Sequence, residues 1–552
     1  MFRIAIYFPA NPQTNCPQTT QNRQNTRPRA HAAHIWPRWG GGVALLVLVS
    51  MALAACTLPR TTTPAAVTPG EGSAPSATLA SLSTAAAPAT APAWPTAALP
   101  QGTTPPASGR TFFVAPHGDN ANPGTRERPW ASPAYGCTRL QPGDTLVLLA
   151  GTYALRDFEH DILRPPSGQK DAWVVIRGET GARPVLIGGN NLLTAIDLSG
   201  TQYVWVENLE ITHDAAASGE AAFFRDGIEI LGRPAAHIVL RHLYIHHLDE
   251  FGLNFQDVED LLLTDSVISH AGFGALGGPA GEHGGWRHVT VQRTAMVFSG
   301  HYYQGGDGTN RPYDRPDGFG IEPSAGPIVL DGVLAAHNLG DGLDSKAERT
   351  LIRNSVVANN TCDGVKLWGD GSVVENTVIY GRGDGQSERT PWASIVIDTE
   401  TPNAVFALRH VTVDDPVPET YLMYVQYDHP DVPVRLVWEN SIFAARGAGR
   451  TIFLAPAVRL EARGNLFFFP ESDAVVRQGE QVWRCDALAA LGEANLCAEP
   501  RWLAPAWGED GDYHLRADSP ARDAGVVTDV RADLEGHPRD NHPDAGAYEW
   551  QP

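Results

Sequence analysis

Lysine is almost missing from this chain of 552 residues. Only three of its 41 basic residues are lysines, Lys170, Lys346 and Lys366, and the rest are arginines. Two of the three follow aspartates in related motifs, D-G-L-D-S-K at 341–346 and D-G-V-K at 363–366. Lysine, unlike arginine, loses its proton when burial or a nearby cation lowers its pKa. Lys366 is therefore the first candidate for a catalytic base.

Positive charge and zinc-binding patterns are also scarce. The formal net charge is −21, so the chain repels nucleic acid and anionic surfaces, and we expect no nucleic-acid partner. A polyanionic substrate would need a bound cation as a bridge. No C-x-x-C or Cys/His spacing typical of zinc occurs. Cys485 and Cys497 are close enough in sequence to form a disulfide in an oxidising compartment.

No hydrophobic run is long enough to span a bilayer comfortably. The apolar run at 43–55 follows five arginines and no acid, and it ends directly before Cys56. This layout resembles a bacterial lipoprotein signal, so residues 1–56 are predicted to be a signal peptide with a lipidated anchor at Cys56. Residues 57–109, rich in Thr, Ala, Pro and Ser, are predicted to be a disordered linker. We expect an extracytoplasmic protein, lipid-anchored to the cell envelope or secreted.

Helical periodicity is absent from the rest of the chain, which instead repeats short alternating strands. Equivalent glycines lie 24 residues apart from Gly318 to Gly342 and 22 apart from Gly342 to Gly364. A unit this small cannot bury its own apolar face, so the units must stack. The pattern resembles right-handed parallel β-helix proteins. The prediction is an all-β, monomeric protein with a right-handed parallel β-helix, a pectate-lyase-like solenoid, over 110–470 and a C-terminal capping segment over 471–552.

Aspartates begin the same short element in three successive coils, at Asp317, Asp341 and Asp363. Equivalent positions of neighbouring coils stack about 4.8 Å apart, so these residues should form one column, with Asp344 beside Lys366 in a second. Stacked carboxylates repel one another. A hard cation such as Ca²⁺ would remove that repulsion.

The same aspartates can be explained as turn residues. Asp-Gly is a common turn dipeptide, and every coil of a β-helix needs turns. Asp226-Gly227 begins a coil well away from the cluster. The turn interpretation therefore remains open, although the extra Asp344 and the retained Lys366 favour a site.

The series D-G-F, D-G-x-D and G-x-K-L, one coil apart, resembles the family 9 pectate lyases. The resemblance implies that Asp317, Asp341 and Asp344 ligate Ca²⁺ and that Lys366 is the base. Its implied reaction is calcium-dependent β-elimination on an acidic polysaccharide, polygalacturonate (pectate) or a related polyuronate. One aspartate of the family pattern is replaced here by Gly340, and Glu322 is the predicted substitute ligand.

Two other functions remain open for the same fold. One is a non-catalytic surface β-helix for adhesion or glycan binding, with the aspartates as turn residues or a structural ion site. The other is a glycoside hydrolase, which would need two carboxylates as acid and base and would leave Lys366 without a role. The fold alone does not choose among these functions.

Insertions beside the aspartates supply candidate substrate contacts. The segment 299–316 comes directly before Asp317, and the loop 382–389 follows Lys366. Tyrosine can stack on sugar rings, and arginine can bind carboxylates. The candidate substrate residues are Tyr303, Arg311, Arg315, Arg382 and Arg389.

Histidines recur at one place after the second strand of a coil, which could suggest a metal site. They are His213, His247, His270 and His337, with Asn359 at the same place in a later coil. Because turns of a β-helix stack like residues on one another, the prediction is a turn ladder without metal.

Overall fold

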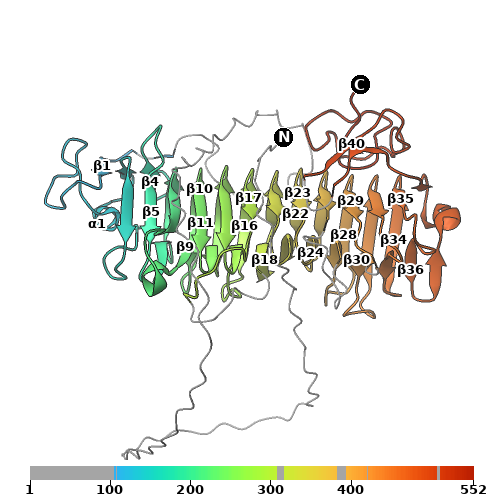
Figure 1. The fold of residues 1–552 in the computed structure, drawn as a ribbon, viewed down its shortest axis with the longest axis horizontal. Coiled ribbons are helices and arrows are strands. Elements are labelled where there is room, and N and C mark those ends of the chain that lie inside the picture. Colours follow the sequence, from blue (N-terminus) through green and yellow to red (C-terminus); the bar gives the residue numbers. More distant parts are fainter. Residues whose placement is uncertain (1–104, 107, 307–315, 382–392, 419–420, 507–509) are drawn as a thin grey trace, which may run out of the picture. The chain divides into compact units, whose positions relative to one another are not determined.

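The computed structural model describes residues 105–106, 108–306, 316–381, 393–418, 421–506 and 510–552. Its strands form three long sheets whose members recur in turn along the chain, so each coil contributes one strand to each sheet (Figure 1). Sheet A contains β1 (Thr111–Val114), β2 (Thr145–Leu148), β4 (Val174–Gly178), β7 (Gln202–Glu207), β10 (Ala235–Arg241), β13 (Val258–Thr264), β16 (Trp286–Gln292), β19 (Ile328–Asp331), β22 (Thr350–Arg353), β25 (Ser372–Glu375), β28 (Ala404–Arg409), β31 (Val434–Glu439) and β34 (Val458–Arg463).

The other two long sheets have the same order along the molecule. Sheet B contains β3 (Thr152–Leu155), β5 (Val185–Gly188), β8 (Glu210–His213), β11 (Tyr244–Leu248), β14 (Val267–Ala271), β17 (Ala295–Val297), β20 (Leu334–Ala336), β23 (Val356–Ala358), β26 (Val378–Tyr380), β29 (Thr412–Asp415), β32 (Ile442–Ala445), β35 (Leu466–Phe468) and β38 (Leu496–Cys497). Sheet C contains β6 (Leu192–Asp197), β9 (Phe224–Ile230), β12 (Phe251–Phe255), β15 (Gly274–Gly277), β18 (Asp317–Ser324), β21 (Leu343–Ala347), β24 (Val365–Leu367), β27 (Ile395–Ile397), β30 (Tyr421–Val425), β33 (Thr451–Leu454), β36 (Val476–Gln478) and β37 (Gln481–Trp483).

Neighbouring coils pair in parallel throughout the three sheets, which confirms the predicted parallel β-helix. Only at the end of sheet C does a strand reverse, where β37 pairs antiparallel with β36. Remaining elements are the helix α1 (Pro133–Cys137), the 3₁₀ helices η1 (Gly219–Ala222) and η2 (Cys485–Leu491), and the antiparallel pair β39 (Trp502–Ala504) and β40 (Asp512–Leu515).

Alternate residues of each strand point into one continuous core. In sheet C the register aligns Leu343, Val365, Ile395, Met423 and Ile452, all of which are fully buried. Each side chain thus covers the equivalent side chain of the next coil, as expected for units that cannot bury their apolar faces alone. The residues between these positions face outward, and the candidate site is built from them.

The histidine positions form the predicted turn ladder. His247, His270, His337 and Asn359 all have φ between 53° and 56°, a region that His and Asn adopt more readily than most residues. The His247 and His270 rings stack 4.6 Å apart, and Phe298 stacks at 5.1 Å on both His270 and His337. Burial, with the neighbouring histidines, lowers the pKa of His247 to about 3 and that of His270 to about 4. These rings are uncharged at neutral pH and stabilise the turn by stacking.

Two parts of the C-terminal segment do different things. Trp483 of β37 and Leu488 of η2 join the main core beyond the last coil, and the predicted disulfide joins Cys485 to Cys497. From β39 onward the chain packs along the outer face of sheet B, where Tyr513 donates a hydrogen bond from its hydroxyl to Asp414 at 2.9 Å. This later part was expected to cap the open end of the last coil. It lies along the flank because its apolar residues cover the outward face of sheet B.

The predicted signal peptide at 1–56, its Cys56 and residues 57–104 of the linker lie outside the described residues, so these assignments stay predictions. The domain boundaries proposed from the sequence likewise stay predictions. Within the described part of the chain, no helix combines the length and apolarity needed to cross a membrane.

Candidate functional site

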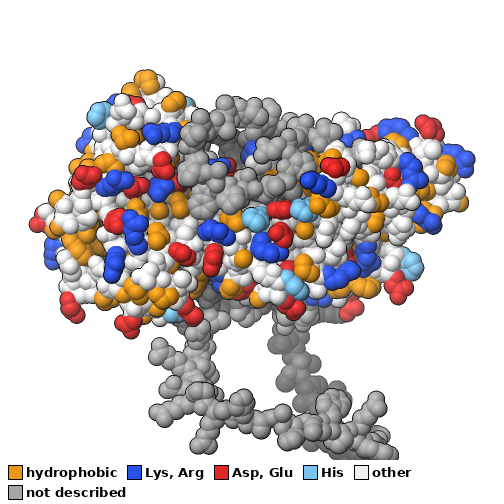
Figure 2. All heavy atoms as spheres, turned by 180° about the vertical axis from the view of Figure 1, so that it is seen from behind, with side chains coloured by type: hydrophobic (Ala, Val, Ile, Leu, Met, Phe, Trp, Pro, Cys, Tyr) orange, Lys and Arg blue, Asp and Glu red, His pale blue; other side chains and the backbone are white. Residues whose placement is uncertain are grey.

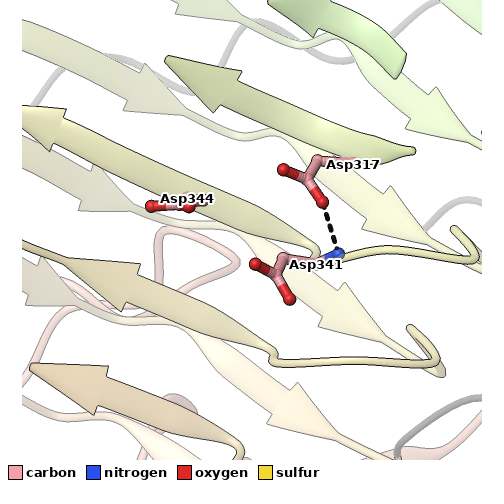
Figure 3. A group of neighbouring side chains, drawn as sticks. All are labelled: Asp317, Asp341 and Asp344. Atoms are coloured by element: carbon pink, nitrogen blue, oxygen red, sulfur yellow. Dashed lines mark hydrogen bonds between the residues drawn. The ribbon is translucent and has the colours of Figure 1, made fainter. Parts of the chain in front are cut away.

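The aspartate column lies at the beginning of three neighbouring strands of sheet C. The register that pairs Phe319 with Leu343 and Leu343 with Val365 sets Asp317, Asp341 and Asp363 in line. Figure 3 shows Asp317 and Asp341 at the starts of adjacent strands, with Asp344 further along the second one.

One oxygen of each carboxylate in the column stabilises the turn of the next coil. The Asp341 N–H donates to Asp317 Oδ1 at 2.7 Å, and the Asp363 N–H donates to Asp341 Oδ1 at 2.8 Å. The Ala393 N–H donates to Asp363 Oδ1 at 2.6 Å. The turn interpretation is therefore correct as far as it goes, and it accounts for one oxygen per aspartate.

The second column brings Asp344 and Lys366 side by side, because these residues are register partners on β21 and β24. Lys366 Nζ lies 3.1 Å from Asp341 Oδ2, 3.5 Å from Asp344 Oδ2 and 3.8 Å from Asp363 Oδ2. Three carboxylates from both columns thus surround one ammonium group whose side chain is 7% exposed.

Burial and like charge leave the cluster short of positive charge. Burial, followed by the charges of Asp341 and Asp344, raises the pKa of Asp317 well above its ordinary value. Burial opposes the charged form of Lys366, but the carboxylates of Asp341 and Asp344 outweigh it and raise the pKa of Lys366. Without a bound cation, Lys366 is an ammonium ion, and Asp317 tends to keep a proton.

The three predicted aspartate ligands fit a calcium ion. One carboxylate oxygen from each of Asp317, Asp341 and Asp344 can be chosen so that all lie within 4.8 Å of one another. Two oxygens at 2.3–2.6 Å from a common Ca²⁺ can be up to about 5 Å apart, so this spacing is compatible with one ion. The raised pKa of Asp317 points the same way, because a divalent cation would replace the proton that this crowded carboxyl retains.

Glu322 lies apart from this group. Its side chain is 45% exposed, and Oε1 is 3.2 Å from Lys346 Nζ. Lys346 in turn lies 3.7 Å from Asp344 Oδ2, so it links Glu322 to the cluster indirectly. The role of Glu322 as a replacement ligand for the missing aspartate at Gly340 remains a prediction.

Trp368 holds Asp344 and covers Lys366. Its indole Nε1 donates to Asp344 Oδ1 at 2.9 Å, and Lys366 Nζ lies 5.7 Å from the ring centroid. Asp344 Oδ2 is left to face Lys366 and Lys346. The indole therefore fixes which oxygen of Asp344 points into the cluster, a role that the sequence did not reveal.

Of the predicted substrate contacts, Tyr303 is described, and its ring stacks on Phe273 with centroids 6.3 Å apart. Phe273 directly precedes Gly274, which is the register partner of Asp317. Tyr303 thus lies near the strand before the aspartate column. Arg311, Arg315, Arg382 and Arg389 lie outside the described residues.

Aromatic residues on the other side of Lys366 were missed by the sequence reasoning. Tyr424 is two strands beyond Lys366 in the same outward row, through Val396. The available signal was the spacing of Tyr421, Tyr424 and Tyr427 on and just after one strand. It could not be connected to Lys366, because the 30 residues from Lys366 to Val396 interrupt the repeat of 22–24.

Comparison with known proteins supports the fold and its hand. Residues 112–385 match the family model described as a Pel9A-like, right-handed β-helix region. This chain therefore carries a right-handed parallel β-helix that resembles those of the pectate lyases of this kind, as its motifs predicted. No curated protein matches the chain.

Several solved structures share the fold at low sequence identity. The structure of XylC with xylose is 10% identical, with 80% of this chain and 98% of that chain covered and a TM-score of 0.54. Pectate lyase Pel9A is 14% identical over 80% of this chain and 97% of that chain, with a TM-score of 0.46. An alginate lyase from Paenibacillus sp. str. FPU-7 is 16% identical over 63% and 99%, with a TM-score of 0.38.

Proposed function

We propose that this protein is a calcium-dependent polysaccharide lyase that cleaves pectate or a related polyuronate by β-elimination, with Lys366 as the base. The observation that carries the proposal is the meeting of Lys366 with carboxylates from two columns, at 3.1 to 3.8 Å. A turn ladder alone needs no lysine, since the backbone N–H groups already satisfy one oxygen of each aspartate.

Asp317, Asp341 and Asp344 would hold the calcium ion. When bound, Ca²⁺ would supply the positive charge that attracts a uronate carboxylate and acidifies the proton on C5 of that sugar. The protein itself offers little positive charge for this task. On the face drawn in Figure 2, basic side chains are interspersed with acidic ones rather than gathered into one patch.

Lys366 would take the C5 proton. The C5–H electron pair then forms a C4–C5 double bond, the bond from C4 to the glycosidic oxygen breaks, and the departing oxygen takes a proton from solvent. The surrounding carboxylates raise the pKa of Lys366. Neutralising Asp341 and Asp344 by a cation lowers that pKa, so the neutral amine becomes available and the reaction should be fastest at alkaline pH.

The test follows the unsaturated uronate by its ultraviolet absorbance, with polygalacturonate at alkaline pH and with Ca²⁺ or a chelator. The proposal expects a rise in absorbance with Ca²⁺ that the chelator abolishes. No rise with polygalacturonate, alginate or other uronate polymers would contradict it and favour a glycan-binding protein.

A glycoside hydrolase is the second candidate, because Asp317 has the raised pKa of a general acid and lies close to other carboxylates. The same reaction mixtures separate the two. A hydrolase releases reducing ends without the absorbing product, and it keeps its activity when Lys366 is replaced.

We also propose that the protein acts outside the cytoplasm, as a monomer anchored through Cys56. The disulfide between Cys485 and Cys497 supports an oxidising compartment. Cells grown with a labelled fatty acid should yield labelled wild-type protein in the membrane fraction. The variant Cys56→Ala should be unlabelled and should leave that fraction, whereas a labelled variant would contradict the anchor.

A further inference from the structure

Four aromatic rings gather on the outward face of sheet C and in the turn that follows β30. Tyr421 and Tyr424 belong to β30, Tyr427 follows it, and Phe453 lies on β33. The centroids of neighbouring rings are 5.5 to 6.2 Å apart, and Tyr427 is 44% exposed. Exposed aromatic groups of this kind mark interaction sites more often than isolated apolar side chains do.

This aromatic cluster, defined as Tyr421, Tyr424, Tyr427 and Phe453, continues the row that contains Lys366. The register runs from Lys366 through Val396 and Tyr424 to Phe453 and then to Arg477 on β36. At the strand spacing of about 4.8 Å, Tyr424 lies about 10 Å and Phe453 about 14 Å from the base along the sheet. Substrate that reaches Lys366 along this row would therefore pass over the rings.

Electrostatic coupling agrees with this placement. Burial and the charge of Asp363 raise the pKa of Tyr424, and Lys366 opposes that effect. Burial raises the pKa of Tyr421, and the positive charge of Arg477 opposes it. The rings thus lie between the Lys366 cluster and an exposed arginine at the far end of the row.

On the other side of Lys366 the same row has a different character. Beyond Asp344 it continues through Gly320 and Gly277, which carry no side chain, to Asn254. It then reaches Glu229 and Asp197. A polyanionic chain gains no stacking over the glycines and meets like charge beyond them, so binding should extend toward the aromatic side.

We propose that the aromatic cluster and Arg477 hold the sugar residues of an acidic polysaccharide on the C-terminal side of Lys366. This inference rests on the proposed function, whose substrate it extends over three more coils. Aromatic faces pack against the C–H faces of pyranose rings, while Arg477 offers a fork of donors to a uronate carboxylate. The occupant is a polysaccharide rather than a protein partner because the rings are continuous with the candidate catalytic row.

The test compares Tyr427→Ala, Phe453→Ala and Arg477→Gln on polygalacturonate and on the shortest cleaved oligomer. Matched controls are Phe158→Ala, an exposed aromatic at 53%, and Arg459→Gln, an exposed arginine on sheet A. Each row variant should raise KM for the polymer about three- to tenfold, leave the shortest oligomer nearly unaffected, and fold as judged by circular dichroism. The controls should match the wild type.

Two results would overturn the inference: row variants that behave like the controls, or equal losses on the polymer and on the shortest oligomer. Binding to immobilised polygalacturonate, measured by affinity electrophoresis, separates it from the proposed function. Retained elimination with unaffected row variants contradicts the aromatic site alone. Binding that depends on the rings without any elimination contradicts the lyase but supports the aromatic site.

Discussion

Two places in sheet C use the same aspartate geometry with different neighbours. Asp226 accepts the Phe251 N–H at 2.8 Å on Oδ1 and the side-chain amide of Asn254 at 2.8 Å on Oδ2. Asp341 accepts the Asp363 N–H at 2.8 Å on Oδ1 and Lys366 Nζ at 3.1 Å on Oδ2. Asn254 and Lys366 occupy the same outward row, each one coil beyond its aspartate.

The comparison separates what an aspartate turn needs from what a reactive site needs. At Asp226 the column continues with the uncharged Phe251 and Gly274, and a neutral amide completes the hydrogen bonding. At Asp341 the column neighbours are two more carboxylates, and the partner is an ammonium group. Only the second arrangement gathers charge that a divalent cation would balance.

Replacing Lys366 should have the largest effect on catalysis. Lys366→Ala removes the proposed base, and the rate of elimination should fall about 10²- to 10⁴-fold. Lys366→Arg keeps the positive charge but cannot accept a proton at these pH values, so it should be equally inactive while unfolding more like the wild type.

The matched control for this prediction is Asn254→Ala, the equivalent change at the first place, which should keep the wild-type rate. Initial rates of formation of the unsaturated product measure all three variants. An active Lys366→Arg would show that this side chain serves only as a counter-ion.

Neutralising one aspartate at each place should affect calcium binding differently. Asp341→Asn removes a proposed ligand, so the Ca²⁺ concentration for half-maximal activity should rise at least about tenfold. Asp226→Asn should leave that concentration unchanged. Calcium titration of the rate checks both, and equal shifts in the two variants would mean that the aspartates affect calcium only through the fold.

Calcium should also stabilise the protein through the second place. A ligand at 100 times its Kd stabilises the folded state by about 2.7 kcal/mol, so the unfolding temperature should rise by a few degrees with Ca²⁺ and return with a chelator. Asp344→Asn should lose the rise, and Asp226→Asn should keep it. Calorimetry with each variant measures the effect, and a rise retained in Asp344→Asn would place the ion elsewhere.

The smallest expected effect is on the pH dependence of stability. The pKa values of both Asp226 and Asp317 are raised by burial and by neighbouring carboxylates, Glu250 for the former and Asp341 for the latter. A raised pKa in the folded state means that stability is greatest below the unfolded value near 4 and falls as pH rises toward neutrality. Asp317→Asn and Asp226→Asn should each reduce that fall when a chelator is present.

Calcium should break the symmetry of this pair. With saturating Ca²⁺, Asp317 binds as the ionised ligand, so its part of the fall with pH should vanish while the part from Asp226 remains. Denaturant midpoints between pH 4 and 7, with and without Ca²⁺, measure this difference. If Ca²⁺ left the Asp317 contribution unchanged, Asp317 would not be a ligand.

The sequence was most informative where the repeat is uninterrupted. Between Asp317 and Lys366 the coils differ by only 22 to 24 residues, so counting along the chain placed Asp344 beside Lys366 correctly. The stacked turn positions of His247, His270 and His337 could be recognised for the same reason. In such regions a fixed repeat length means a fixed register.

The repeat pattern by itself thus determined the parallel β-helix, the meeting of the aspartates with Lys366, and the pairing of Cys485 with Cys497. Only the tertiary structure decided which carboxylate oxygen serves a backbone N–H and which faces Lys366, and how Trp368 orients Asp344. It also placed Tyr424 and Phe453 on the row of Lys366 and the C-terminal residues along sheet B. These features depend on insertions of irregular length and on contacts between residues distant in sequence, which no local repeat encodes.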